Sequence, residues 1–121
     1  MELIGLLVDD KPGVMQRISG VFTRKKCNIE TIVVGKCEVP HQSRIVLSIK
    51  ERGDAQTVIR ILEKLEDVHD VKILNGDAHY ECLAMDDTGR TERVAGSKQE
   101  IDAFMNKNEW KKFIKVIYAL W

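Results

Sequence analysis

The first 75 residues alternate between the two hydrophobic periods that distinguish strands from helices, and this alternation restricts the fold more than any other feature of the chain. Four segments have the apolar runs, β-branched residues or apolar–polar alternation that are typical of strands. They are residues 3–8, 29–34, 43–50 and 68–74. In the third segment, Ile45, Leu47 and Ile49 share one face. A turn-like break at residues 39–42 predicts that the second and third strands form a hairpin.

Two amphipathic helices are predicted between these strands. The apolar face of the first consists of Val14, Ile18, Val21 and Phe22. This helix follows Asp10-Lys11-Pro12-Gly13, and we expect Pro12 in its first turn, where proline is tolerated. The apolar face of the second consists of Val58, Ile61, Leu62 and Leu65. Asp54 is the candidate N-cap of this second helix.

The resulting order is strand, helix, strand, strand, helix, strand. Right-handed crossovers place both helices on one face of a four-stranded antiparallel sheet, which is the ferredoxin-like α+β arrangement. The other face of such a sheet must be solvated or must pack against something else. We therefore expect residues 1–75 to form one domain with a single helix-covered face.

Residues 76–121 predict a shortened second α+β unit. Strands are expected at 78–86, at 92–95 and in the apolar segment from Phe113 to Trp121, with a turn at 87–89. A third helix opens with the capping-box pattern Ser97-x-x-Glu100. Its inner face consists of Ile101, Phe104 and Met105. The last segment is apolar on both strand faces, which favours a central strand or a subunit contact.

The charge of the chain excludes several classes of function. It has 121 residues with 19 Lys+Arg against 19 Asp+Glu, so it lacks the basic excess that binding to nucleic acid by bulk charge requires. The strands 3–8 and 43–50 also lack the aromatic residues on which RNA-binding sheets stack bases. A neutral chain has little long-range repulsion between copies, so self-association stays open.

Few residues carry catalytic or metal-binding chemistry. The sequence contains no triad pattern, nucleophile elbow or phosphate-binding loop of the known types, and its histidines are scattered. Cys27, Cys37 and Cys82 have neither disulfide nor zinc spacing and are expected as free thiols in the cytoplasm. The N-terminal apolar run is too short for a membrane span and lacks the pattern of a secretory signal. Asp9-Asp10 is interpreted as a loop or cap element because adjacent strand residues point to opposite faces.

The loop Asp10–Gly13 is the remaining candidate site. A glycine at the start of a helix lets backbone N–H groups approach a carboxylate, and the helix dipole favours the negative charge. On spacing alone, a strand-to-helix turn without any ligand is the favoured interpretation of this loop.

At this loop the sequence resembles a known family. The loop is followed by the run Arg17–Phe22 and by Cys27-Asn28-Ile29-Glu30, and Ser43-Arg44-Ile45 opens the third strand. These motifs resemble the ACT domain and, more narrowly, the regulatory small subunits of acetolactate synthase, which is also called acetohydroxyacid synthase. The segments 94–97 and 101–104 resemble the last part of the same subunits.

The resemblance implies a non-catalytic protein that holds an amino-acid effector between two paired ACT domains. The residues implied to bind the ligand are Asp10, Gly13, Val14 and Met15 of one copy with Asn28 and Ile29 of the other. Backbone N–H groups at 13–15 would hold the carboxylate, Asp10 or Asn28 would meet the ammonium, and Val14, Met15 and Ile29 would surround a branched side chain. The implied homodimer or higher homo-oligomer needs no cofactor or metal of its own.

The resemblance also implies a partner and a role. The partner is the thiamine-diphosphate-dependent catalytic subunit of acetolactate synthase, which the small subunit activates and makes sensitive to valine. Two departures leave alternatives open. The family usually has asparagine at the position of Asp10, and its second half is usually longer than residues 76–121. A stand-alone ACT-domain sensor for another enzyme and a dimerisation module without a ligand therefore stay open.

Overall fold

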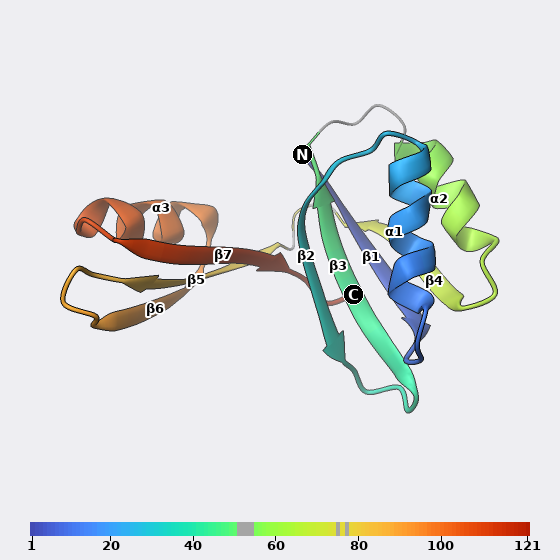
Figure 1. The fold of residues 1–121 in the computed structure, drawn as a ribbon, viewed down its shortest axis with the longest axis horizontal. Helices are drawn as coiled ribbons and strands as arrows, with labels where there is room; N and C mark the ends of the chain where they lie inside the picture. The colour runs from blue at the N-terminus through green and yellow to red at the C-terminus, as the bar shows by residue number, and fades with distance from the viewer. Residues whose placement is uncertain (51–54, 75, 77) are drawn as a thin grey trace.

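The computed structural model describes residues 1–50, 55–74, 76 and 78–121 and contains two antiparallel sheets (Figure 1). The larger sheet has the strand order β2-β3-β1-β4 and the smaller one the order β6-β5-β7. The elements in chain order are β1 (Glu2–Asp9), α1 (Val14–Arg24), β2 (Ile29–Lys36), β3 (Gln42–Ile49), α2 (Ala55–Glu63), β4 (Val68–Leu74), β5 (His79–Met85), β6 (Thr91–Gly96), α3 (Lys98–Lys107) and β7 (Lys112–Tyr118). The predicted α+β class, with a ferredoxin-like first unit and a shortened second unit, is confirmed.

The core of the larger sheet follows directly from the alternation in the sequence. Strand β1 pairs antiparallel with β3 on one edge and with β4 on the other. Its even-numbered residues Ile4, Leu6 and Val8 are buried under α1 and α2. The predicted inner faces of β3 and α1 join the same core, with Ile45, Leu47, Ile49, Val14, Ile18, Val21 and Phe22 all buried. Both helices lie on one face of this sheet, as Figure 1 shows.

The helix boundaries differ in detail from the prediction. Helix α1 begins at Val14 with Gly13 as its N-cap, so Pro12 precedes the helix and is not part of its first turn. The buried residues of α2 are Ala55, Val58, Ile59 and Leu62. Ile61 and Leu65 are only partly buried against the same core, because the helix turns a slightly different stripe inward and ends at Glu63. The candidate N-cap Asp54 lies outside the described residues.

The smaller sheet has one helix on one face. The capping box of α3 is formed as predicted, since the Ser97 side chain accepts from the Glu100 N–H and the Glu100 carboxylate accepts from the Ser97 N–H. The turn before β6 is held by Asp86, whose Oδ1 accepts from the Thr88 and Arg90 N–H groups. The core of this unit is small. It consists of Cys82, Ala84 and Ile101, with Tyr80, Val94, Phe104, Met105 and Trp110 packed around them.

Of the two settings predicted for the last strand, the central position was wrong, and the subunit contact stays a prediction. Strand β7 is an edge of the smaller sheet and pairs with β5. Phe113 and Ile114 in its first half are 56% and 61% exposed, whereas Ile117 and Ala119 are buried against the larger sheet. The apolar side chains in the second half of this segment therefore pack on the larger sheet, whereas those of Phe113 and Ile114 are exposed.

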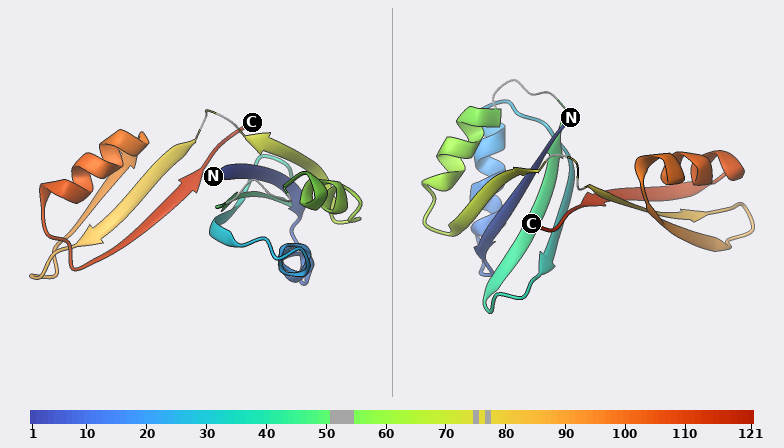
Figure 2. Two further views of the ribbon diagram at one scale, coloured as in Figure 1. Left: turned by 90° about the horizontal axis from the view of Figure 1, so that it is seen from above. Right: turned by 180° about the vertical axis from the view of Figure 1, so that it is seen from behind.

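The C-terminal segment covers part of the helix-free face of the larger sheet. Leu3, Val46, Ile117 and Ala119 form a second buried cluster, and Trp121 packs beside it. The left view of Figure 2 shows this segment reaching the larger sheet on the side opposite α1 and α2. The Trp121 ring lies over the Arg44 guanidinium at 4.7 Å, and its Nε1 donates to Asp70 at 3.4 Å. The two units are thus joined by packing as well as by the chain.

Gly5 makes room for this packing. A Cβ built on Gly5 would stand 2.7 Å from the Trp121 ring and 2.8 Å from the Leu74 side chain. At Gly35, on β2 of the same sheet, an added Cβ would meet nothing within 4 Å.

The chain has, among the described residues, no helix that is both long and apolar enough to cross a membrane.

We predict that Gly5→Ala lowers the free energy of unfolding by about 1–3 kcal/mol, because overpacking a filled interface forces side chains from their preferred positions. Gly35→Ala is the matched control and is expected to change this free energy by less than about 0.5 kcal/mol. Urea denaturation measures both. Trp121→Ala should remove most of the effect of Gly5→Ala, and equal stabilities of the two glycine variants would show that Trp121 does not pack on Gly5.

Candidate functional site

The loop between β1 and α1 presents the open end of a helix. Gly13 adopts φ 88° and ψ −15°, a left-handed conformation that glycine accepts without a steric penalty. The first intrahelical hydrogen bond runs from the Arg17 N–H to the Gly13 carbonyl at 3.1 Å. The N–H groups of the residues between them therefore lie at the helix start, and the Gly13 N-cap has no side chain with which to cap them. This is the backbone arrangement that favours a bound carboxylate.

Backbone hydrogen bonds fix this loop on two sides. The Asp9 N–H donates to the Asp67 carbonyl and the Asp10 N–H donates to the His41 carbonyl, both at 2.9 Å. Asp67 lies in the connection between α2 and β4, and His41 lies in the turn between β2 and β3. The loop is thereby held at a defined position relative to these two connections at the same end of the larger sheet.

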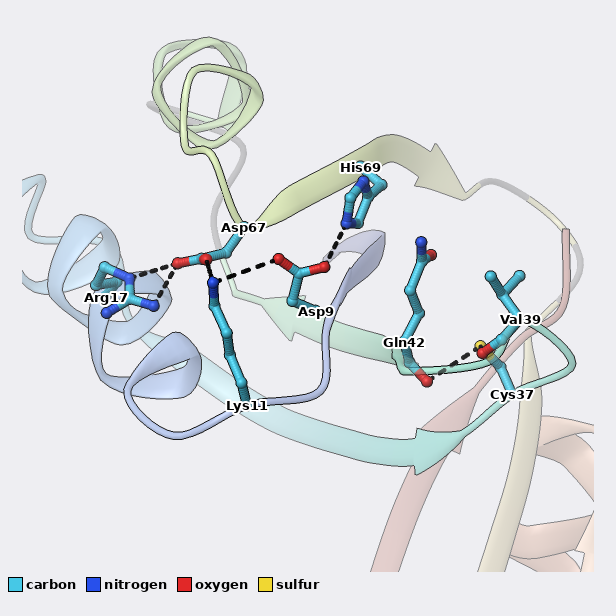
Figure 3. A network of polar contacts seen from close by, with 8 residues as sticks. All are labelled: Asp9, Lys11, Arg17, Cys37, Val39, Gln42, Asp67 and His69. Atoms are coloured by element: carbon cyan, nitrogen blue, oxygen red, sulfur yellow. Dashed lines mark hydrogen bonds and ion pairs between the residues drawn. The ribbon is translucent and has the colours of Figure 1, made fainter.

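A network of charged side chains surrounds the loop, with Asp67 at its centre (Figure 3). Lys11 Nζ lies 2.9 Å from Asp67 Oδ1, and Arg17 Nε donates to Asp67 Oδ2 at 2.6 Å. Arg17 Nη2 also contacts Oδ2. The hydrogen bond from Lys11, and after it the one from Arg17, lowers the pKa of Asp67. Asp67 is only 7% exposed, so its carboxylate is both buried and fully engaged with cations.

Asp9 forms the second part of the network. Its Oδ1 lies 2.6 Å from His69 Nε2, and its Oδ2 lies 3.7 Å from Lys11 Nζ. The hydrogen bond with His69 lowers the pKa of Asp9. Figure 3 shows Lys11 and Arg17 directed toward Asp67 and His69 directed toward Asp9. Asp9 is thus engaged with β4 at the end of β1, while its neighbour Asp10 is exposed in the loop.

The six residues expected to bind a ligand lie at two places in the chain. Asp10 and Gly13 are exposed in the loop. The Val14 side chain is 2% exposed and packs in the helix-facing core, so Val14 offers a ligand at this loop its backbone N–H rather than its side chain. Met15 is half-buried and packs against the same core.

Asn28 and Ile29 lie at the other end of α1, where β2 begins (Figure 1). An 11-residue helix spans about 16 Å. One copy of the chain therefore does not bring these two residues to the Gly13 loop. Asn28 is exposed and Ile29 is half-buried.

Strand β2, which Asn28 precedes, is an edge of the larger sheet. Ile32 and Val34 on this strand are 39% and 47% exposed. They pair with Leu47 and Ile45 and so lie on the helix-covered side of the sheet. An edge strand that carries exposed apolar side chains is a natural place for another strand to pair.

Sequence reasoning missed the charged residues of the network. Arg17 and Asp9 stand in the matched motif, but their partners, Asp67 and His69 respectively, are 50 and 60 positions away in the chain. The spacing of Arg17 four residues after Gly13 was a usable signal, because residues four apart share one face of a helix. Nothing in the hydrophobic pattern places Asp67 beside them.

Within the described residues, no group of three or more His, Cys, Asp or Glu side chains is arranged to hold a metal ion. The Cys37 thiol instead faces two backbone carbonyls, those of Val39 at 3.9 Å and Gln42 at 3.6 Å (Figure 3). Cys37 thus lies in the connection between β2 and β3.

Comparison with known proteins decides the family. Residues 4–70 match the family described as the AHAS small subunit-like ACT domain, where AHAS stands for acetohydroxyacid synthase. The chain belongs to this family. The match spans β1 to β4 up to Asp70 and so includes the Gly13 loop, Asn28 and Asp67. The resemblance found in the sequence motifs is confirmed.

Curated relatives carry the same family name. The chain is 44% identical over 69 residues to a probable acetolactate synthase small subunit of Methanothermobacter thermautotrophicus, covering 57% of this chain and 40% of that protein. It is 33% identical over 102 residues to the acetolactate synthase small subunit of Haemophilus influenzae, covering 82% of this chain and 60% of that protein. The chain thus spans between two fifths and three fifths of the length of these relatives.

A solved structure extends the likeness of fold to the second unit. The crystal structure of an acetolactate synthase small subunit from Thermotoga maritima matches with a TM-score of 0.79 at 21% sequence identity, covering 99% of this chain and 97% of that chain. Both sheets of this ACT-domain protein therefore follow an arrangement that is already known.

Proposed function

We propose that this chain is the non-catalytic regulatory subunit of a cytoplasmic acetolactate synthase and that it binds a branched-chain amino acid, with valine as the effector. The observation that carries the proposal is the loop before α1. Its N-cap residue Gly13 has a left-handed backbone conformation, and the loop lies inside the segment that matches the family. The naming of the curated relatives as acetolactate synthase small subunits supports the choice of partner.

The chemistry of the loop suits an amino acid. The N–H groups of Gly13, Val14 and Met15 would hold the effector carboxylate at the positive end of the helix dipole. The exposed Asp10 carboxylate would accept from the ammonium group. Met15 and the partner copy's Ile29 would contact the branched side chain.

Pairing through β2 would complete the site from a second copy. The end of β2 lies at the same end of the sheet as the loop, because Lys36 pairs with Ser43 and Ser43 pairs with Val8. In an antiparallel pair of β2 strands, the start of one strand lies beside the end of the other. The Asn28 of one copy would then approach the Gly13 loop of its partner. The exposed Ile32 and Val34 and the zero net charge favour such a pair.

The proposed role is regulatory rather than chemical. The small subunit would bind and activate the thiamine-diphosphate-dependent catalytic subunit and would transmit inhibition by valine, as feedback on branched-chain amino-acid biosynthesis. Effector binding and partner binding would then be reciprocally coupled, typically by about 1–3 kcal/mol.

A stand-alone ACT-domain sensor that acts on another enzyme is the second candidate. One observation favours it, namely Asp10 at the position where the family usually has asparagine. This candidate keeps the effector site and changes the partner.

We expect Gly13→Asp to abolish valine binding in calorimetric titration. The new side chain adds bulk and a negative charge where the effector carboxylate would lie, and it strains a position with φ 88°. Gly89→Asp is the matched control, because Gly89 has φ 87° in the turn between β5 and β6 with open space around it. Its valine affinity should equal that of the wild type. Unchanged affinity in Gly13→Asp would remove the loop from the site.

The partner is tested by co-expression with an acetolactate synthase catalytic subunit from the same organism. We expect the two chains to co-purify, the small subunit to raise acetolactate formation, and valine to reverse part of that increase. The Gly13→Asp variant should still co-purify and activate but should confer no valine sensitivity. Valine binding to the isolated chain without any co-purification would favour the second candidate.

A further inference from the structure

The Arg17 guanidinium lies directly over the Gly13 loop. Arg17 is on the first turns of α1, and helical side chains of this length point back toward the helix start. Its Nε and Nη2 face the Asp67 carboxylate. Its Nη1 lies on the other side, 2.9 Å from the position that a Cβ on Gly13 would occupy. One edge of the guanidinium is thus bound to Asp67, and its remaining terminal nitrogen is placed against the backbone that precedes the helix.

Asp67 holds this orientation. The Asp67 backbone is fixed because its carbonyl accepts from the Asp9 N–H at 2.9 Å. Its other carboxylate oxygen is bound by Lys11 Nζ at 2.9 Å, so the carboxylate cannot turn away from Arg17 without losing a second ion pair. Arg17 Nε and Nη2 both contact Asp67 Oδ2, so one edge of the guanidinium is held against the carboxylate. Arg17 is therefore oriented although its side chain is 48% exposed.

We propose that Arg17 Nη1 donates a charged hydrogen bond to the carboxylate of the effector and that Asp67 is the positioning residue that aims it. The inference rests on the proposed function and adds to it a side chain that recognises the ligand, beside the backbone N–H groups. It also defines the ligand class more narrowly. The site requires a free α-carboxylate, so amino-acid amides and amino alcohols with the same side chain are poor ligands.

The network around Arg17 fits this role. Asp67 is shared by Lys11 and Arg17, whereas Asp9 is engaged by His69 and more distantly by Lys11. Arg17 is the cation of this network whose Nη1 atom, which does not face Asp67, lies beside Gly13. A purely structural clamp between α1 and the α2–β4 connection would need only Nε and Nη2. The measurement must therefore separate recognition of a carboxylate from support of the loop.

The test compares valine with valinamide, in which a neutral amide replaces the carboxylate, by calorimetric titration of the full chain. Arg17→Gln should weaken valine binding by about 10- to 100-fold, the range expected for a lost hydrogen bond to a charged group. It should leave valinamide binding nearly unchanged, so the preference for valine over valinamide should be largely lost. Arg24→Gln, an exposed arginine at the end of the same helix, is the matched control and should keep the wild-type preference.

Two further variants separate orientation from charge. Asp67→Asn should weaken valine binding in the wild-type background but have little additional effect in Arg17→Gln, because it acts through Arg17. Arg17→Lys keeps the charge without the fork of nitrogens and should retain part of the preference for valine. It also provides a second readout if Arg17→Gln fails to fold, as judged by circular dichroism.

The outcomes distinguish this inference from the proposed function. If the wild-type chain binds neither compound, the effector site and the role of Arg17 both fail. If the wild type binds valine and Arg17→Gln binds it equally well, only the role of Arg17 fails. Equal losses of valine and valinamide binding in Arg17→Gln would also overturn it, because they would show a clamp that supports the loop without recognising the carboxylate.

Discussion

The position of β1 determines where everything else in this molecule lies. It is hydrogen-bonded to β3 and β4 on its two edges, and it is packed on both faces. Ile4, Leu6 and Val8 meet the helices, while Leu3 and Gly5 lie under the C-terminal segment. Because β1 is fixed in this way, the loop that follows it projects from a rigid strand end. A binding loop on a rigid scaffold costs less ordering on binding than a mobile one.

The second constraint is electrostatic and acts on the same loop. Lys11 comes from the loop, Arg17 from α1 and Asp67 from the connection before β4, so their ion pairs tie three segments together. Depressed pKa values for Asp67 and Asp9 accord with carboxylates that stay ionised beside their partners. The result is a helix start with fixed N–H groups and a fixed guanidinium beside them. This is the arrangement on which the proposed effector site is built.

Local patterns in the sequence predicted most of the fold. The faces of α1 and β3 and the capping box of α3 depend on spacings of two to four residues, which the sequence displays directly. The edge position of β7 was not predictable in this way, because Phe113–Trp121 is apolar throughout and only tertiary packing decides which residues meet the larger sheet. The contact of Trp121 with Gly5 joins the two ends of the sequence and has no local signal.

The candidate site also has one part that local sequence patterns predict and one part that depends on tertiary packing. The Gly13 loop was predicted, because a glycine between a strand and a helix has a backbone consequence that the sequence shows. The pairing of Arg17 with Asp67 was not, because it depends on how the α2–β4 connection crosses the end of β1. The assignment of Asn28 came from the family resemblance, and because Asn28 and Gly13 lie at opposite ends of α1, the proposed site depends on a second copy.

That dependence is the central claim and is most directly tested by mixing two inactive variants. Gly13→Asp and Asn28→Asp homodimers should each bind no valine. After unfolding and refolding together, the mixed dimer should contain one site with both residues intact and should bind one valine per dimer in calorimetric titration. If each site instead lies within one chain, every site in the mixed dimer carries one defect. No recovery of binding in an isolated mixed dimer would therefore contradict a site shared between two copies.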